Sequence, residues 1–197
     1  MKSCNYSFFD FFQRGGMKKL ISQSIKVCMV SALFLAGAAG IVSAVQQPVS
    51  YPLAPGFAAV SLNGKPVGSA QLSGKVYIVN FFASWCPPCR LEIPDMVALQ
   101  NQYGRKGFTF IGVAVNETEP KIRAFISKNK ISYPVVMADE QLVSAFNRYV
   151  EGGIHAIPTS FVVNSSGRIT QVITGARSKA VFDKIISDAL RKTETPK

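Results

Sequence analysis

Three short stretches of the chain are almost continuously apolar, at residues 76–82, 108–115 and 133–137. Each is preceded by a polar or glycine residue. Apolar runs of this length are typical of strands that are buried on both faces of a sheet. We therefore expect these three stretches to form the centre of a β-sheet.

Two pairs of shorter strands are separated by turn sequences. Residues 159–163 and 168–174 flank Asn164-Ser165-Ser166-Gly167, which predicts an antiparallel hairpin. Residues 57–62 and a short strand after them flank Asn63-Gly64, a strong hairpin signal. The chain is thus expected to contain one hairpin near each end of the folded part.

Between the strands, the apolar positions recur every three or four residues, which predicts amphipathic helices. The helices are expected to begin after Cys86, Thr118, Asp139 and Ser178, and Thr and Asp are favoured caps. Their predicted inward-facing residues are Ile93, Met96 and Val97; Ile122, Phe125 and Ile126; Leu142, Val143 and Phe146; and Val181, Phe182, Ile185, Ile186 and Leu190. Alternating strands and helices predict an α/β layered fold, and the closing hairpin makes the sheet mixed.

The front of the chain has the pattern of an export signal. Lys18, Lys19 and Lys26 precede an uncharged stretch at 27–45, in which small residues lead up to Ala44. We expect signal-peptide cleavage near Ala44, which would leave a soluble protein. The alternative is an uncleaved anchor over 27–45, close to the roughly 20 apolar residues that span a bilayer. Both interpretations place the body in the periplasm or another extracytoplasmic space.

These patterns divide the chain into four parts. Residues 1–44 are an N-terminal extension with the signal peptide or anchor, and residues 45–55 form a linker that contains three prolines. Residues 56–192 are the predicted domain, and residues 193–197 form a tail.

Composition narrows the possible functions. The 197 residues are 48% hydrophobic and 17% charged, which is typical of a globular protein with one core. The formal net charge is +11, and residues 1–44 carry five basic residues against one acidic residue, which leaves +7 for the rest. Because no basic run is interleaved with aromatic residues, we predict no nucleic-acid partner.

The chain has four cysteines, of which Cys4 and Cys28 lie in the N-terminal extension. Cys86 and Cys89 stand where a buried strand meets a helix, and one helical turn brings cysteine Cα atoms within the about 4.4–6.8 Å of a disulfide. A helix N-terminus also stabilises a thiolate, which is the attacking species in disulfide exchange. We predict a redox-active Cys86–Cys89 disulfide, with Cys86 as the exposed nucleophile and Cys89 as the resolving thiol.

Other uses of this cysteine pair fit the sequence less well. A zinc site needs two more ligands, and the body offers only His155 beyond the pair, so we predict no metal. A structural disulfide that closes so short a loop adds little stability. Inert thiols are unusual beside Trp85 in an exported protein. We expect no cofactor apart from the redox-active disulfide.

The sequence Trp85-Cys86-Pro87-Pro88-Cys89 after a buried strand resembles the thioredoxin superfamily. Residues 56–190 are similar to its TlpA/ResA-like branch of exported, often membrane-tethered reductases. Pro94 matches a helix-kinking proline of the family, and residues 154–161 resemble the loop whose proline, here Pro158, is cis. The resemblance implies a thioredoxin-like fold with a central mixed sheet, an N-terminal hairpin and an inserted helix–strand element.

Glu92 follows Cys89 by three residues, so its carboxyl is expected to lean toward the cysteines. There it would exchange protons and raise the thiol pKa values. In ResA-like proteins the glutamate at this position is linked to such a role. The alternative is an exposed first-turn glutamate favoured by the helix dipole. Asn80 stands where thioredoxins carry a buried aspartate, and we expect a hydrogen-bonded strand residue there.

The resemblance also implies a substrate groove at the cis proline, in which a substrate chain pairs with the backbone of Ile157 beside Pro158. Trp85, next to Cys86, completes the predicted substrate contacts. Some cytochrome-maturation relatives carry glutamate just after this proline, whereas this chain has Thr159, which argues against that narrower group.

Together these features predict an exported enzyme, a thiol–disulfide oxidoreductase. The resemblance implies a reductase of disulfides in exported proteins such as apocytochrome c, with electrons from a membrane thiol donor. An oxidase or isomerase that donates the disulfide would use the same residues, because only the redox potential differs. A copper-site maturation factor is a third interpretation, against which the narrow cysteine spacing argues.

Overall fold

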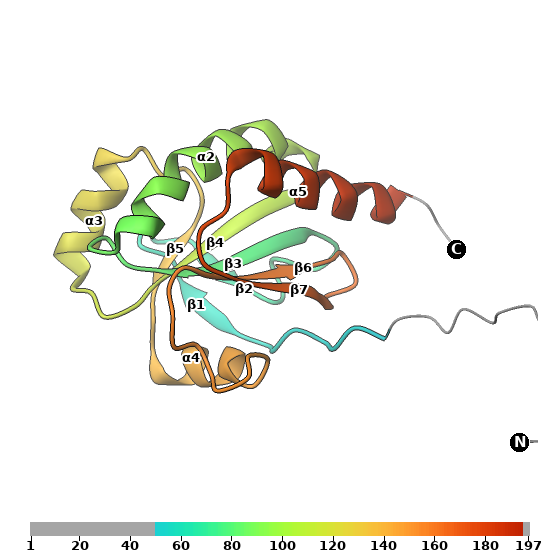
Figure 1. The fold of residues 1–197 in the computed structure, drawn as a ribbon, viewed down its shortest axis with the longest axis horizontal. Helices are drawn as coiled ribbons and strands as arrows, with labels where there is room; N and C mark the ends of the chain where they lie inside the picture. Colours follow the sequence, from blue (N-terminus) through green and yellow to red (C-terminus); the bar gives the residue numbers. More distant parts are fainter. Residues whose placement is uncertain (1–49, 195–197) are drawn as a thin grey trace, which may run out of the picture. The chain divides into compact units, whose positions relative to one another are not determined.

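The computed structural model describes residues 50–194 (Figure 1). A five-stranded mixed sheet in the order β5-β4-β3-β6-β7 forms the middle layer of this part of the chain. The central strand β3 (Val76–Phe82) pairs in parallel with β4 (Phe108–Ala114) and antiparallel with β6 (Thr159–Val163). The outer strands are β5 (Val135–Met137), parallel to β4, and β7 (Ile169–Thr174), antiparallel to β6. The predicted mixed sheet is confirmed.

The four predicted helices are present, and each begins directly after the residue that the sequence indicated. They are α2 (Pro87–Tyr103), followed by the 3-10 turn η1 (Gly104–Lys106), α3 (Glu119–Lys128), α4 (Glu140–Asn147) and α5 (Lys179–Glu194). Figure 1 shows α2 and α5 together on one face of the sheet and α4 on the opposite face. The last helix continues to residue 194, two residues beyond the predicted end of the domain.

The two predicted polar caps differ in their hydrogen bonds. Asp139 Oδ1 accepts a hydrogen bond from the Leu142 backbone N–H at 2.6 Å, as expected for an N-cap aspartate. Thr118 has the extended backbone of an N-cap residue, but its side chain makes no capping hydrogen bond. The prediction for α3 was therefore right in position and wrong in mechanism.

The N-terminal hairpin consists of β1 (Ala58–Val60) and β2 (Pro66–Gly68), which pair antiparallel around the predicted turn. Gly64 takes a positive φ of 81°, which glycine adopts without steric cost. The first strand is shorter than the predicted residues 57–62, because the backbone of Ser61 hydrogen-bonds within the turn.

Part of the predicted linker lies against the domain. The backbone carbonyl of Pro52 accepts a hydrogen bond from Ile169 N, and Ala54 N donates to Gly167 O. Residues 51–54 therefore lie alongside the turn between β6 and β7. The predicted leader, the start of the linker and residues 195–197 lie outside the described residues. Within residues 50–194, no helix combines the length and apolar character needed to cross a membrane.

Alternation along β3 divides the core into two apolar layers. Val76, Ile78 and Phe82 belong to the layer that contains buried residues of α2 and α5, whereas the odd-numbered residues belong to the layer with α4. Asn80 has the same parity as the first set, and successive strand residues point to opposite faces. The central strand therefore presents one buried amide toward the helix that carries the cysteines.

Asn80 lies in a lateral row across the sheet, paired with Gly112 of β4 and Ser160 of β6. A Cβ atom on Gly112 would lie 2.9 Å from Phe82 Cε1 and 3.2 Å from Val135 Cγ2. Neither contact relaxes without displacing a core residue, so the space at this position is already filled.

We predict that Gly112→Ala destabilises the protein by about 1–3 kcal/mol, because overpacking forces core side chains out of their preferred positions. Denaturant unfolding measures the loss. The matched control is Gly56→Ala, where no atom lies within 4 Å of the added Cβ. Equal unfolding midpoints for the two variants would contradict this account of the core.

Candidate active site

The cysteine pair lies where β3 turns into α2. Cys86 is the N-cap of α2 with an extended backbone, and Pro87 and Pro88 occupy the first helical positions, where N–H groups have no helical partner. The Cys86 N–H donates to Ala83 O, and the Cys86 carbonyl accepts from Arg90 N. The sulfur of Cys86 therefore stands at the positive end of the helix.

Both cysteines are free thiols and their side chains are hydrogen-bonded to each other. Cys89 is fully buried and Cys86 is 4% exposed, so the predicted exposed nucleophile is in fact covered. The covering group is the loop before β6, since Cys86 Sγ lies 3.7 Å from the Ile157 carbonyl oxygen. Of the two thiols, Cys86 is still the one that solvent reaches.

Burial raises the pKa of the Cys89 thiol well above its usual value, and the hydrogen bond with Cys86 adds to this effect. A backbone hydrogen bond at Ala83 acts in the opposite direction, and the negative charge of Glu92 again raises the pKa. Cys89 is therefore held as a neutral thiol, and a carboxyl group lies within electrostatic reach of it.

Glu92 is buried, with 2% exposure, which excludes the interpretation as an exposed first-turn residue. Its Oε1 accepts a hydrogen bond from Asn80 Nδ2 at 2.9 Å, and its Oε2 accepts one from the Arg177 backbone N–H at 3.2 Å. Burial raises the pKa of Glu92 to about 7, while the two hydrogen bonds and the Arg177 charge lower it. The carboxyl can therefore gain or lose a proton near neutral pH.

Asn80 connects the central strand to this carboxyl. Its Nδ2 donates to Glu92 Oε1 and also to Ser160 Oγ, each at 2.9 Å. Asn80 was predicted as a hydrogen-bonded strand residue, but its link to Glu92 was missed. The alternation of side chains along β3 could have predicted this link, because Asn80 lies on the face of the strand that is directed toward α2.

The loop before β6 has the geometry that the resemblance implied. The Ile157–Pro158 peptide bond is cis, and Pro158 is buried. Thr159 Oγ1 donates to Ala156 O at 2.7 Å, and Gly175 N donates to Pro158 O. These contacts hold the Ile157 carbonyl next to the Cys86 sulfur.

Trp85 is 56% exposed, and its indole N–H donates to the Asn116 carbonyl at 3.2 Å. The neighbouring Glu117 accepts a hydrogen bond from the Ser84 backbone N–H at 2.5 Å. Sequence reasoning missed both contacts with the loop after β4. Because β3 and β4 are parallel, their carboxyl ends meet at one edge of the sheet, and that pairing was the signal that pointed to this loop.

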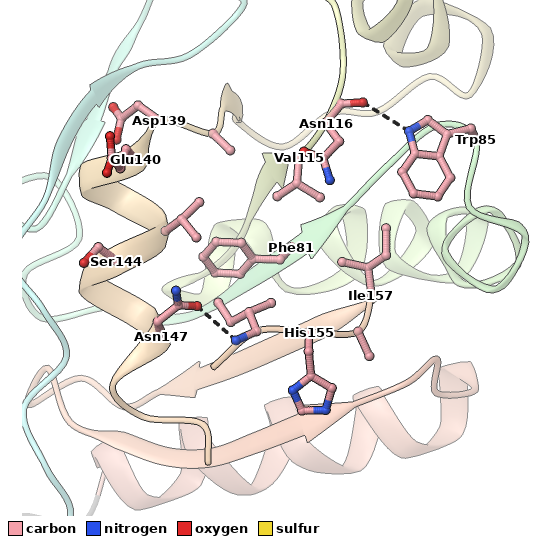
Figure 2. A pocket seen from close by; sticks show the side chains of 14 residues that line it. Phe81, Trp85, Val115, Asn116, Asp139, Glu140, Ser144, Asn147, His155 and Ile157 are labelled. Atoms are coloured by element: carbon pink, nitrogen blue, oxygen red, sulfur yellow. Dashed lines mark hydrogen bonds between the residues drawn. The ribbon is translucent and has the colours of Figure 1, made fainter. Parts of the chain in front are cut away.

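A groove of about 640 Å³ runs from Trp85 and Ile157 to helix α4 (Figure 2). Phe81 lies between these two ends. The remaining lining residues are Val115, Asn116, Ala138, Asp139, Glu140, Val143, Ser144, Asn147, Ile154, His155 and Ala156. We call this surface the α4 groove.

The cysteine pair is not joined by further metal-binding side chains in the described part of the chain. Among residues 50–194, no cluster of three or more His, Cys, Asp or Glu side chains is placed to hold a metal ion.

Comparison with known proteins places this site in a family. Residues 44–187 match the Redoxin family. The chain is 29% identical over 130 residues to the thiol-disulfide oxidoreductase ResA of Bacillus subtilis (strain 168), covering 66% of this chain and 69% of that protein. It is 31% identical over 126 residues to ResA of Bacillus thuringiensis (strain Al Hakam), covering 64% of this chain and 70% of the relative.

A solved structure is also similar. The crystal structure of a thiol:disulfide interchange protein of the thioredoxin family from Chlorobium tepidum TLS is 53% identical in sequence, with a TM-score of 0.71. The match covers 73% of this chain and 99% of that one.

We predict that Glu92→Gln lowers the pKa of Cys89 by about 1 pH unit, because it removes a nearby negative charge. Thiolate absorbance, titrated in the reduced protein, measures this change. Glu151→Gln removes an exposed carboxylate and serves as the control. Identical titrations of the wild type and Glu92→Gln would show that the carboxyl does not act on the thiols.

The raised pKa of Glu92 also predicts a pH-dependent stability. Below about pH 4.5 the folded and unfolded states both hold the proton; between about 4.5 and about 7 only the folded state keeps it. The free energy of unfolding should therefore fall as the pH rises through this range, by about 3 kcal/mol from this group. In Glu92→Gln the decline should be smaller by that amount, as measured by denaturant unfolding at pH 5 and pH 7.5. Parallel pH profiles would contradict the prediction.

Proposed function

The chain belongs to the Redoxin family, within the TlpA/ResA-like branch of the thioredoxin superfamily, and we propose that it reduces protein disulfides outside the cytoplasm. The protein is a thiol–disulfide oxidoreductase. Cys86 and Cys89 are the proposed redox couple, with no other cofactor. The observation that carries the direction of electron flow is the environment of Cys89.

A strong oxidant stabilises its reduced form by stabilising a thiolate. At this site burial raises the pKa of Cys89, and the Glu92 charge raises it further. These effects disfavour a thiolate on Cys89, so this buried cysteine does not add to the stability of the reduced form. They favour a couple that gives its electrons to a substrate disulfide.

In the proposed reaction, the Cys86 thiolate attacks one sulfur of a substrate disulfide. A Cys86–substrate disulfide forms, and the second substrate sulfur leaves as a thiolate that takes up a proton. Cys89 then loses its proton and attacks Cys86 Sγ, which releases the first substrate sulfur as a thiol. Two electrons and two protons reach the substrate, and the enzyme is left with a Cys86–Cys89 disulfide.

Glu92 is proposed to serve the second step. The buried Cys89 thiol must lose its proton before it attacks, and water has little access to it. A carboxyl with a pKa of about 7 can accept a proton at neutral pH and release it again afterwards. Asn80 and Arg177 hold that carboxyl through backbone and side-chain hydrogen bonds.

The leader supports the proposed location and partners. Its positive segment and uncharged stretch at 27–45 fit export, with either a soluble product after cleavage near Ala44 or an anchored one. Outside the cytoplasm an oxidised enzyme needs a dedicated source of electrons, and we propose a membrane thiol donor. The proposed substrates are disulfide-bearing exported proteins, apocytochrome c among them, with Trp85, Ile157 and Pro158 in contact with the substrate chain.

The redox potential of the Cys86–Cys89 couple tests the direction of the reaction. We expect a value below about −200 mV, in the range of reducing members of the superfamily. Equilibration with glutathione or thioredoxin buffers, followed by thiol trapping, measures it. A value near about −120 mV is typical of a strong oxidant and would overturn the reductase assignment.

A matched pair of variants tests which cysteine attacks the substrate and which one resolves the mixed disulfide. Cys89→Ser should accumulate a covalent enzyme–substrate disulfide, because the resolving thiol is absent. Cys86→Ser should form none and should lose turnover by at least about 10³-fold. Non-reducing electrophoresis and mass spectrometry detect the adduct, and trapping by Cys86→Ser instead would reverse the assigned roles.

A further inference from the structure

The α4 groove differs in charge from the rest of the protein. Lys and Arg outnumber Asp and Glu by 22 to 11 in the chain, yet the groove lining contains Asp139 and Glu140 and neither Lys nor Arg. We propose that this groove binds the substrate segment next to the attacked cystine and selects segments with apolar residues near the cystine and Lys or Arg beyond them. The inference rests on the proposed attack by Cys86 and adds a substrate class to it.

The groove begins at two residues next to the reacting cysteine. Trp85 directly precedes Cys86, and the Ile157 carbonyl lies 3.7 Å from Cys86 Sγ. Both residues line the groove at the same end (Figure 2). A substrate chain that is joined to Cys86 through a mixed disulfide therefore starts at this end and can extend toward α4.

The middle of the groove is apolar. Val115, Val143 and Ile154 are half-buried, and Phe81 lies between the Trp85 end and α4 in Figure 2. Apolar side chains of a substrate would remove these surfaces from water, which favours binding by about 25 cal/mol per Å² of apolar area. The residues closest to the attacked cystine are therefore expected to be apolar.

The far end of the groove is acidic. Asp139 and Glu140 are exposed at the start of α4, and Figure 2 shows them together at that end. The helix N-terminus itself carries only about half a positive charge, which two carboxylates outweigh. Arg148, the C-cap residue of α4, lies outside the groove lining and is placed over the Tyr149 ring. A cationic side chain of the substrate is thus favoured at this end.

The net charge of the chain predicts the opposite preference. A basic protein attracts acidic peptides over long distances, and this attraction raises their association rates. If the groove played no part in recognition, acidic peptides would react faster than basic ones. Faster reaction of basic peptides would therefore indicate recognition in the groove, and faster reaction of acidic peptides would indicate attraction by the net charge of the protein.

The test uses three peptides, each with one cysteine in a mixed disulfide with thionitrobenzoate. Apolar residues flank the cysteine, and Lys, Gln or Glu residues lie beyond them on both sides. Attack of Cys86 on the peptide sulfur releases the coloured thionitrobenzoate thiolate, which stopped-flow absorbance follows. The measurements use the reduced full-length protein at pH 8 and low salt, where charge interactions are least screened.

We expect the Lys peptide to react about 10-fold faster than the Glu peptide, because two carboxylates at the edge of a groove contribute a few-fold each. In the double variant Asp139→Asn/Glu140→Gln, the ratio should fall to about 2-fold or less. Asparagine preserves the N-cap of α4, so the helix should remain intact. An equal or greater rate for the Glu peptide with the wild type would overturn the proposal, as would an unchanged ratio in the double variant.

Glu119→Gln is the matched control, since Glu119 is the first residue of α3 as Glu140 is of α4 but does not line the groove. It should keep the wild-type ratio, and loss of the preference in this variant would overturn the proposal. Reduction of uncharged hydroxyethyl disulfide reports the chemistry alone and should be equal in the wild type and Glu119→Gln. A strongly oxidising potential would defeat the reductase assignment while leaving the peptide preference intact, so the two failures are distinguishable.

Discussion

The hydrogen bond between Asn80 Nδ2 and Glu92 Oε1 joins the central strand to the helix that carries the cysteines, inside a largely apolar layer. Burial of a carboxyl group is unfavourable unless hydrogen bonds compensate for lost hydration. Asn80 and the Arg177 backbone provide two such bonds. The desolvation that they do not offset raises the pKa of Glu92 to about 7. Because β3 also leads directly to Cys86, one strand fixes both the reacting sulfur and the acid behind it.

This arrangement explains why an amide stands at position 80. Asn80 donates both to Glu92 and to Ser160, and an ionised aspartate has no hydrogen to donate. Two carboxyl groups at this distance would repel each other, and one of them would have to stay protonated. A buried aspartate on the strand, as in thioredoxins, and a buried glutamate on the helix are therefore alternative solutions, and this chain has the second.

Hydrophobic patterning predicted the strands and helices well, because burial of whole faces determines them. Val76–Phe82 was predicted with its observed bounds, and every helix began at the expected residue. Contacts between elements were harder to predict. The link between Asn80 and Glu92 depends on sheet parity, and the burial of Cys86 depends on a loop 71 residues later in the chain. The α4 groove unites residues from separate segments, so no local pattern reveals it.

In the proposed function, the two faces of β3 separate chemistry from substrate recognition. Asn80 points to the α2 side and holds the Glu92 carboxyl, whereas its neighbour Phe81 points to the α4 side and lines the groove. On these proposals, adjacent residues of one strand serve proton transfer and substrate binding independently. On the same proposal, substitutions at the start of α4 would change which protein is bound without altering the environment of Cys89. Conversely, a substitution of Asn80 would change the pKa of the Glu92 carboxyl and leave the groove intact. The redox chemistry and the choice of substrate could therefore change independently of each other.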